Sequence, residues 1–152
     1  MMNKLISAKQ LIELQRMLTI NQLYSIYLKG ILQSYALNHR LPAYAPIDID
    51  ILIRINKIDK LIKLLRNKGF RLSKTIYNYS EIDLYHNPQL TFVNTSNSKL
   101  PRAIDVHLLI FNPTKSIFNS MPVNKGLKIT RQMFLRKRKI KFGPTNFFIL
   151  EN

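Results

Sequence analysis

The sequence predicts a single α+β domain, α/β-like in its order of elements, in which helices flank a mixed β-sheet. Two apolar runs, over 47–54 and 103–111, contain polar residues at the period of two that is typical of strands. Residues 58–65 instead repeat apolar side chains at the spacing of an amphipathic helix. Strands interspersed with helices, with hairpins late in the chain, favour a mixed sheet.

Local signals predict where the elements begin and end. Ser7 followed by Gln10 has the pattern of a capping box, so a first helix is expected after Ser7. Asn56 is expected to cap the helix that starts near residue 58, and Gly69 to end it. The remaining expected elements are a buried strand over 24–28, a helix over 31–37, weaker strands over 70–72, 82–86 and 90–93, and a partly helical basic segment over 131–139.

Composition limits the class of protein. The 152 residues, 46% of them hydrophobic, suit one minimal domain over 1–152, with a core at about 20–112 and a basic C-terminal segment over 113–152. The absence of cysteine excludes disulfides, zinc–thiolate sites and cysteine nucleophiles. The sequence has neither an apolar run long enough to span a bilayer nor a signal peptide. We therefore expect a soluble, cytoplasmic protein with no membrane partner; its oligomeric state stays open.

The charge is strongly positive, because 24 Lys and Arg face only 8 Asp and Glu, which gives +16. A field of that size attracts polyanions such as RNA or nucleotides. The alternative is that lysine only solvates the surface. The densest basic stretch holds Arg136, Lys137, Arg138 and Lys139, which are candidates for nucleic-acid contact or for a solvated face.

Two aspartates, Asp48 and Asp50, interrupt an otherwise apolar run. Side chains on a strand alternate between its faces, so both carboxylates share one face. Neighbouring carboxylates repel each other unless a cation lies between them, and Mg²⁺ or Mn²⁺ is the obvious candidate. Taken alone, such a pair is more often two solvated surface residues.

Two further signals accompany this pair. Lys29 and Gly30 stand at an expected strand-to-helix turn, where backbone N–H groups can approach phosphates, although a glycine there is more often only a turn. Asp105 and His107 lie on the polar side of the strand over 103–111. Together with Asp48 and Asp50 they form the combination that metal-dependent nucleotidyl transfer requires.

This combination resembles the uncharacterised nucleotidyltransferase family of the DNA polymerase β-like superfamily. The resemblance covers about residues 20–110 and consists of Leu28-Lys29-Gly30, Asp48-Ile49-Asp50, a helix closing on Gly69-Phe70, and Asp105-Val106-His107. It implies the nucleotidyltransferase fold and transfer of a nucleoside monophosphate from an NTP to a hydroxyl of RNA such as tRNA, of a protein or of a small molecule.

The resemblance also implies roles for single residues. Asp48, Asp50 and Asp105 would be the catalytic carboxylates and metal ligands, with Asp105 as a possible general base. Lys29 and Gly30 would contact the nucleotide, with ATP among the candidate NTPs. His107 would orient the acceptor or a metal-bound water, or alternatively serve as a structural hydrogen-bonding group.

The chain departs from the family at several positions. Ile31 follows Gly30 where many members of the superfamily have serine, and Tyr44 and Ile47 replace an Arg-Pro pair and a small residue ahead of the first aspartate. The helices that usually follow the core would begin near Phe147, close to the last residue of this sequence. Two alternatives therefore stay open: an inactive RNA-binding module, and an interaction module whose apolar C-terminus docks on a partner.

Overall fold

The computed structural model describes residues 8–28, 30–40, 48–73, 89–109, 120–124, 127–130 and 135–150. Its elements are helices α1 (Ala8–Ile20), α2 (Ile31–Asn38) and α3 (Ile58–Asn67), the short 3₁₀ helix η1 (Ile55–Lys57), and strands β1 (Ile26–Tyr27), β2 (Asp48–Arg54), β3 (Phe70–Leu72), β4 (Gln89–Asn94), β5 (Ala103–Leu109), β6 (Ser120–Asn124), β7 (Leu127–Thr130), β8 (Arg138–Phe142) and β9 (Thr145–Ile149). The expected strand over 82–86 and the expected cap Ser7 lie outside the described residues.

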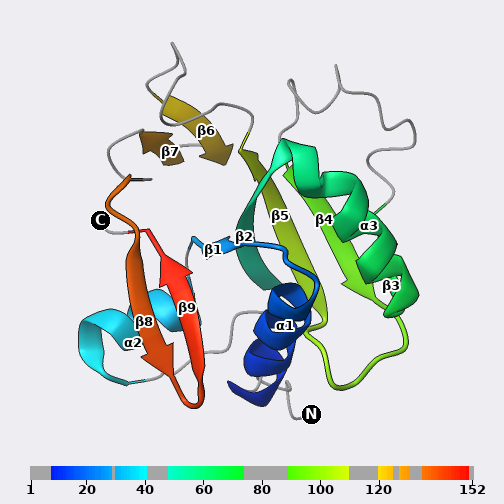
Figure 1. Cartoon of the computed structure of the whole chain (residues 1–152), viewed down its shortest axis with the longest axis horizontal. Helices are drawn as coiled ribbons and strands as arrows, with labels where there is room; N and C mark the ends of the chain where they lie inside the picture. Colours follow the sequence, from blue (N-terminus) through cyan, green and yellow to red (C-terminus); the bar gives the residue numbers. More distant parts are fainter. Residues whose placement is uncertain are drawn as a thin grey trace.

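Seven strands form one mixed sheet in the order β3-β4-β5-β2-β1-β9-β8 (Figure 1). The β2–β5 and β1–β9 pairs are parallel, and the other neighbours are antiparallel. Strands β6 and β7 form a separate two-stranded sheet. The predicted mixed sheet with flanking helices is confirmed.

One face of the large sheet is apolar and carries all three helices. Every second residue of β2 and β5 on that face is buried, for example Ile51 and Val106, which are register partners. The helices contribute apolar side chains to the same cluster, namely Leu11, Leu14 and Leu18 from α1, Ile31 and Leu32 from α2, and Ile58, Leu61 and Leu65 from α3. The polar residues of β2 and β5 are thereby left on the opposite face of the sheet.

The sheet twists across its seven strands (Figure 1), as β-sheets generally do. In Figure 1 helices α1 and α3 lie in front of the strands, whereas α2 lies behind the β8–β9 hairpin. The ring of Tyr35 on α2 lies 5.0 Å from that of Phe142 on β8, measured between centroids, which confirms the packing of α2 on the hairpin. Because the sheet twists, its one apolar face packs against α1 and α3 in the foreground of Figure 1 and against α2 in the background.

Two sequence-based expectations for these elements are wrong. The N-cap of α3 is Lys57 and not Asn56, because Asn56 is taken up in the 3₁₀ turn that precedes the helix. Arg138 and Lys139, expected in a partly helical segment, lie on strand β8. Tertiary pairing decides here, because β8 joins β9 as an antiparallel hairpin at the edge of the sheet.

The apolar C-terminal residues also belong to the sheet. Strand β9 pairs in parallel with β1, and Phe147 and Ile149 are buried in the same core as Tyr27. The core therefore includes described residues on both sides of 20–112, from Leu11 to Ile149. Phe147 and Ile149 are thus buried within this chain while Phe148 is partly exposed, and the alternative in which the C-terminus docks on a partner stays open.

Helix α1 is anchored to the loop between β4 and β5. The Nε2 of Gln10 donates hydrogen bonds to the carbonyl oxygens of Ser98 and Leu100, at 3.0 and 3.1 Å. Further along the helix, the buried Gln15 accepts hydrogen bonds from Ser25 and Tyr27. No helix within the described part of the chain is long and apolar enough to cross a membrane.

Gly69 forms the turn between α3 and β3 and has a backbone conformation that favours glycine. Its φ is +87°, and a Cβ at this position would clash with Ser96 Oγ. We expect Gly69→Ala to lower the free energy of unfolding by about 1–2 kcal/mol, because L-residues disfavour the left-handed region. Urea denaturation measures the change. The double variant Gly69→Ala, Ser96→Gly removes the clash with the serine side chain but keeps the strained backbone. Full recovery of stability in that double variant would show that the loss does not come from the backbone conformation of residue 69.

Candidate active site

The predicted carboxylates meet on the polar face of the sheet. In the parallel pair of β2 and β5, Asp50 lies directly opposite Asp105, and Asp48 lies opposite Ala103. Side chains at paired positions point to the same face, so the three carboxylates share it. Asp50 is 7% exposed, and Asp48 and Asp105 are partly exposed. The sequence predicted that Asp48 and Asp50 share a face, and the structure brings Asp105 alongside them.

Two neighbouring side chains hold these carboxylates. His107 is 1% exposed, and its Nε2 lies 2.9 Å from Asp50 Oδ1. An ionised carboxylate only accepts hydrogen bonds, so the imidazole is the donor. On the other side, Thr91 Oγ1 donates to Asp105 Oδ1 at 2.7 Å. Within the described residues, no buried side-chain nitrogen or oxygen lacks a hydrogen-bond partner.

The acidic cluster is electrostatically costly. Burial raises the pKa of Asp105 above its ordinary value, and the negative charges of Asp48 and Asp50 raise it further. The hydrogen bond from Thr91 and the nearby His107 act in the opposite direction but do not cancel the rise. The fold therefore keeps Asp105 on the same face as two like charges that raise its pKa, and a cation near them would relieve this repulsion.

The turn before α2 lies next to the first aspartate. Gly30 has φ 84° and ψ −137°, a conformation that residues with a Cβ rarely adopt, and it is the N-cap of α2. Gly30 and Asp48 line the same small cavity of about 10 Å³. The backbone N–H of Leu28 also donates to the carbonyl oxygen of Asp50 at 3.1 Å. The N-terminus of α2 therefore lies near Asp48. Lys29 lies outside the described residues.

The donor types suit a hard divalent cation, because carboxylate oxygens are the ligands that Mg²⁺ prefers. As they lie, however, no three His, Asp or Glu side chains of the described residues are grouped closely enough to hold one metal ion. Asp50 and Asp105 are engaged with His107 and Thr91. The metal-ligand assignments stay a prediction.

The predicted basic residues are not part of this cluster. Arg138 and Lys139 lie on β8, which β9 and β1 separate from β2. Arg136 is exposed just before β8, and Lys137 is partly exposed. A contact of these residues with nucleic acid would thus occur on another part of the sheet than the carboxylates.

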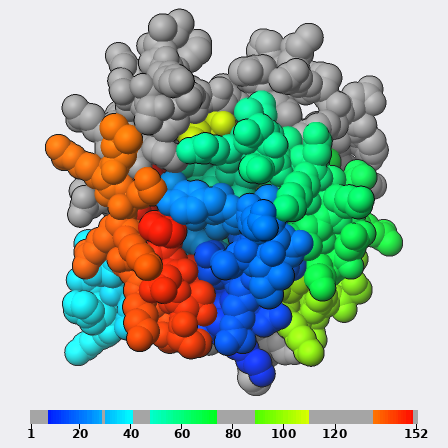
Figure 2. Space-filling model, in the orientation of Figure 1, coloured from blue at the N-terminus to red at the C-terminus, as the bar shows by residue number. Residues whose placement is uncertain are grey.

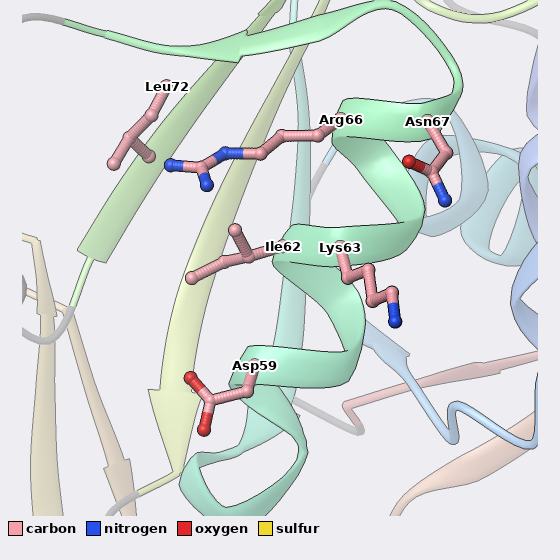
Figure 3. Close-up of a pocket in the computed structure, with 6 residues that line it drawn as sticks. All are labelled: Asp59, Ile62, Lys63, Arg66, Asn67 and Leu72. Atoms are coloured by element: carbon pink, nitrogen blue, oxygen red, sulfur yellow. The ribbon is translucent and has the colours of Figure 1, made fainter.

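A larger cavity lies on the other side of the sheet. Its volume is about 370 Å³, and Figure 3 shows its lining residues on α3 and β3, namely Asp59, Ile62, Lys63, Arg66, Asn67 and Leu72. The guanidinium group of Arg66 extends from the helix toward Leu72 (Figure 3). Because α3 covers the apolar face, this cavity does not open onto the carboxylates.

Thr91 is the site residue that sequence reasoning missed. It lies between Leu90 and Phe92, both buried, so alternation alone places it on the polar face of β4. Only the β4–β5 register brings it opposite Asp105. The same register brings Gln89 opposite His107, which extends the polar strip across a third strand.

The raised pKa of Asp105 predicts a pH-dependent stability. The folded chain binds this proton more tightly than the unfolded chain, so stability falls as pH rises from the ordinary value of 3.8 through the raised value. We expect Asp105→Asn to unfold at a higher temperature than the wild type at pH 7, and the difference to vanish below pH 3.8. Glu13→Gln, at an exposed site on α1, is the control. A gain that persists unchanged in acid would refute this electrostatic origin.

The His107–Asp50 hydrogen bond predicts energetic coupling. We expect His107→Leu to lower the free energy of unfolding by about 1–3 kcal/mol, since it removes a buried hydrogen bond to a carboxylate. In a double-mutant cycle with Asp50→Asn, followed by urea denaturation, the two losses should not add. Strict additivity would mean that the two side chains do not interact in solution.

Comparison with known proteins identifies the fold. No protein-family model matches the sequence, and no curated protein matches it significantly. Among solved structures, the chain is similar to the lincosamide antibiotic adenylyltransferase LnuA in its lincomycin-bound form, with a TM-score of 0.65 and 12% sequence identity. The match covers 97% of this chain and 82% of that chain. The chain thus shares the nucleotidyltransferase fold of this adenylyltransferase.

Proposed function

We propose that this protein is a metal-dependent nucleotidyltransferase that transfers a nucleoside monophosphate from an NTP to an acceptor hydroxyl. The observation that carries the proposal is the register of β2 and β5, which sets Asp50 opposite Asp105 on the polar face. Asp48 shares that face, and the turn at Gly30 lies beside it. The likeness of the fold to an adenylyltransferase supports the same class of reaction.

The residues have distinct tasks in this proposal. The N-terminus of α2, entered through Gly30, accommodates the triphosphate, because its free N–H groups and helix dipole favour anions. Asp48, Asp50 and Asp105 would hold Mg²⁺ or Mn²⁺, with their carboxylates drawn closer together than in the free chain. The bound metal supplies Lewis acidity and neutralises phosphate charge. Lys29, next to Gly30, would add a positive charge.

Asp105 is suited to a second task. Its pKa is already raised by burial and by its two acidic neighbours. A carboxylate with a raised pKa is a better proton acceptor, so Asp105 would take the proton from the acceptor hydroxyl. His107 acts through its contact with Asp50 and orients that carboxylate on the strand. His107 is therefore a positioning residue in this proposal.

The acceptor stays open among RNA, protein and small molecules. The neighbour of known structure is named as an adenylyltransferase of lincosamide antibiotics, so ATP and a lincosamide belong among the first substrates to be tried. RNA belongs among them because of the net charge of +16. The alternative of an inactive RNA-binding module predicts RNA binding that needs neither Mg²⁺ nor Asp48.

The test of activity uses α-labelled ATP, GTP, CTP and UTP with Mg²⁺ or Mn²⁺, offered in turn with cellular RNA, protein and lincomycin. We expect label on one acceptor class, and at least a hundredfold loss with Asp48→Asn or Asp50→Asn, because a bound metal contributes several kcal/mol to the transition state. Asp59→Asn, on α3 across the sheet, is the matched control and should retain activity. Full turnover by both strand variants would exclude these carboxylates.

Metal binding can be measured without activity. Mg²⁺ that binds only the folded chain raises the melting temperature by mass action. We expect that shift in the wild type and its loss in Asp50→Asn and Asp105→Asn, with Asp59→Asn unchanged. If all four proteins respond equally, the ion binds elsewhere and the proposed metal site is wrong.

A further inference from the structure

An exposed pair of aromatic rings joins strand β9 to the segment that leads into β1. The rings of Tyr24 and Phe148 have centroids 5.0 Å apart and planes inclined at 46°. Tyr24 is 46% exposed, and Phe148 is partly exposed. Its neighbour Phe147 is fully buried, so alternation along β9 directs Phe148 to the side that the helices do not cover. These two rings are therefore not needed to fill the core.

A positive charge flanks each end of this pair. On one side, Lys139 is the register partner of Phe148, so the two side chains share a face. On the other side, β1 pairs Ile26 with Leu52, and continuing this register by two residues brings Tyr24 opposite Arg54. Burial raises the pKa of Tyr24, and Arg54 lies close enough to offset part of that rise. Both cations are exposed.

Arg54, Tyr24, Phe148 and Lys139 form one row, which we call the aromatic row. Its residues lie on β2, just before β1, on β9 and on β8, and four positions at strand spacing span about 14 Å. In Figure 2 the orange and red C-terminal hairpin lies directly beside the blue segment that leads into β1. Four residues far apart in the sequence are thus joined only by the sheet.

The charge around the row is positive. Lys141 and Asn146 are the next exposed register pair of the hairpin, on the same side as Lys139 and Phe148. Of the five described acidic residues, Glu13 is on α1, Asp59 on α3 and Asp105 on β5, while Asp48 and Asp50 precede Arg54 on the same face of β2. The row therefore presents two ring surfaces between cations.

We propose that the aromatic row binds single-stranded nucleic acid, with bases stacked on Tyr24 and Phe148 and phosphates held by Arg54 and Lys139. Aromatic rings between basic side chains are the usual platform for unpaired strands, because every base has a face that can stack. A duplex keeps its bases stacked on each other and cannot use such rings. Binding by the row does not depend on the proposed transferase activity, so either can fail without the other.

The test measures the fluorescence anisotropy of a labelled RNA of about 12 nucleotides, a length within the range of single-strand binding sites, and of the same RNA as a duplex. We expect Tyr24→Leu to weaken single-strand binding about tenfold, because it removes a stacking surface, and Tyr24→Phe to retain it. The duplex should lose little in either variant. Thermal unfolding verifies that both variants are folded.

A second set of variants tests the role of charge by comparing two lysines in the same binding assay. We expect Lys139→Gln to weaken binding and to reduce the slope of log K against log salt by about 0.7, as expected for one lost phosphate contact on a single strand. Lys60→Gln, an equal change at an exposed position of α3, should leave both close to wild type. Equal losses from the two lysine variants, or unchanged binding by Tyr24→Leu, would overturn the proposal. Absence of RNA binding in the wild type would do so as well.

Discussion

The parallel pairing of β2 with β5 is the constraint on which the structure depends. Its register fixes both faces of the sheet at once, with Ile51 beside Val106 on the helical side and Asp50 beside Asp105 on the polar side. A slip by one residue would turn the apolar side chains away from α1 and α3 and bury the acids beneath them. The hydrophobic effect therefore enforces the meeting of the carboxylates, although it acts on other residues.

The cost of that meeting is concentrated in a few side chains. The ionised form of Asp105 is disfavoured, since its pKa is raised by burial and by two like charges. His107 and Thr91 offset part of the cost through hydrogen bonds, and both come from positions that the sheet register sets. Perturbed acids of this kind cluster at functional sites, because a chain without a use for them is more stable without them. The same electrostatics that weakens the free fold favours a bound cation.

The C-terminal hairpin gives the sheet a second surface. Because β9 pairs with the very short β1, Phe147 and Ile149 complete the core that α1 and α2 cover. The intervening Phe148 then faces outward and meets Tyr24. Arg54 ends β2 on the face that carries Asp48 and Asp50, so this surface and the carboxylates occupy different parts of the same face of the sheet. The basic residues of β8 belong to this second surface, and not to the candidate active site.

Local patterns in the sequence determined the elements with a strong period and the polar faces of two strands. Alternation predicted β2 and β5 and grouped Asp48 with Asp50, and the helical spacing of Ile58, Leu61 and Leu65 predicted α3, because side-chain direction follows directly from backbone period. Contacts between distant segments were decided by tertiary structure alone. Thr91 meets Asp105, and Arg138 lies on a strand and not in a helix, because strand partners are chosen by burial across the whole sheet. For the same reason the sequence alone could not bring Arg54, Tyr24, Phe148 and Lys139 into one row.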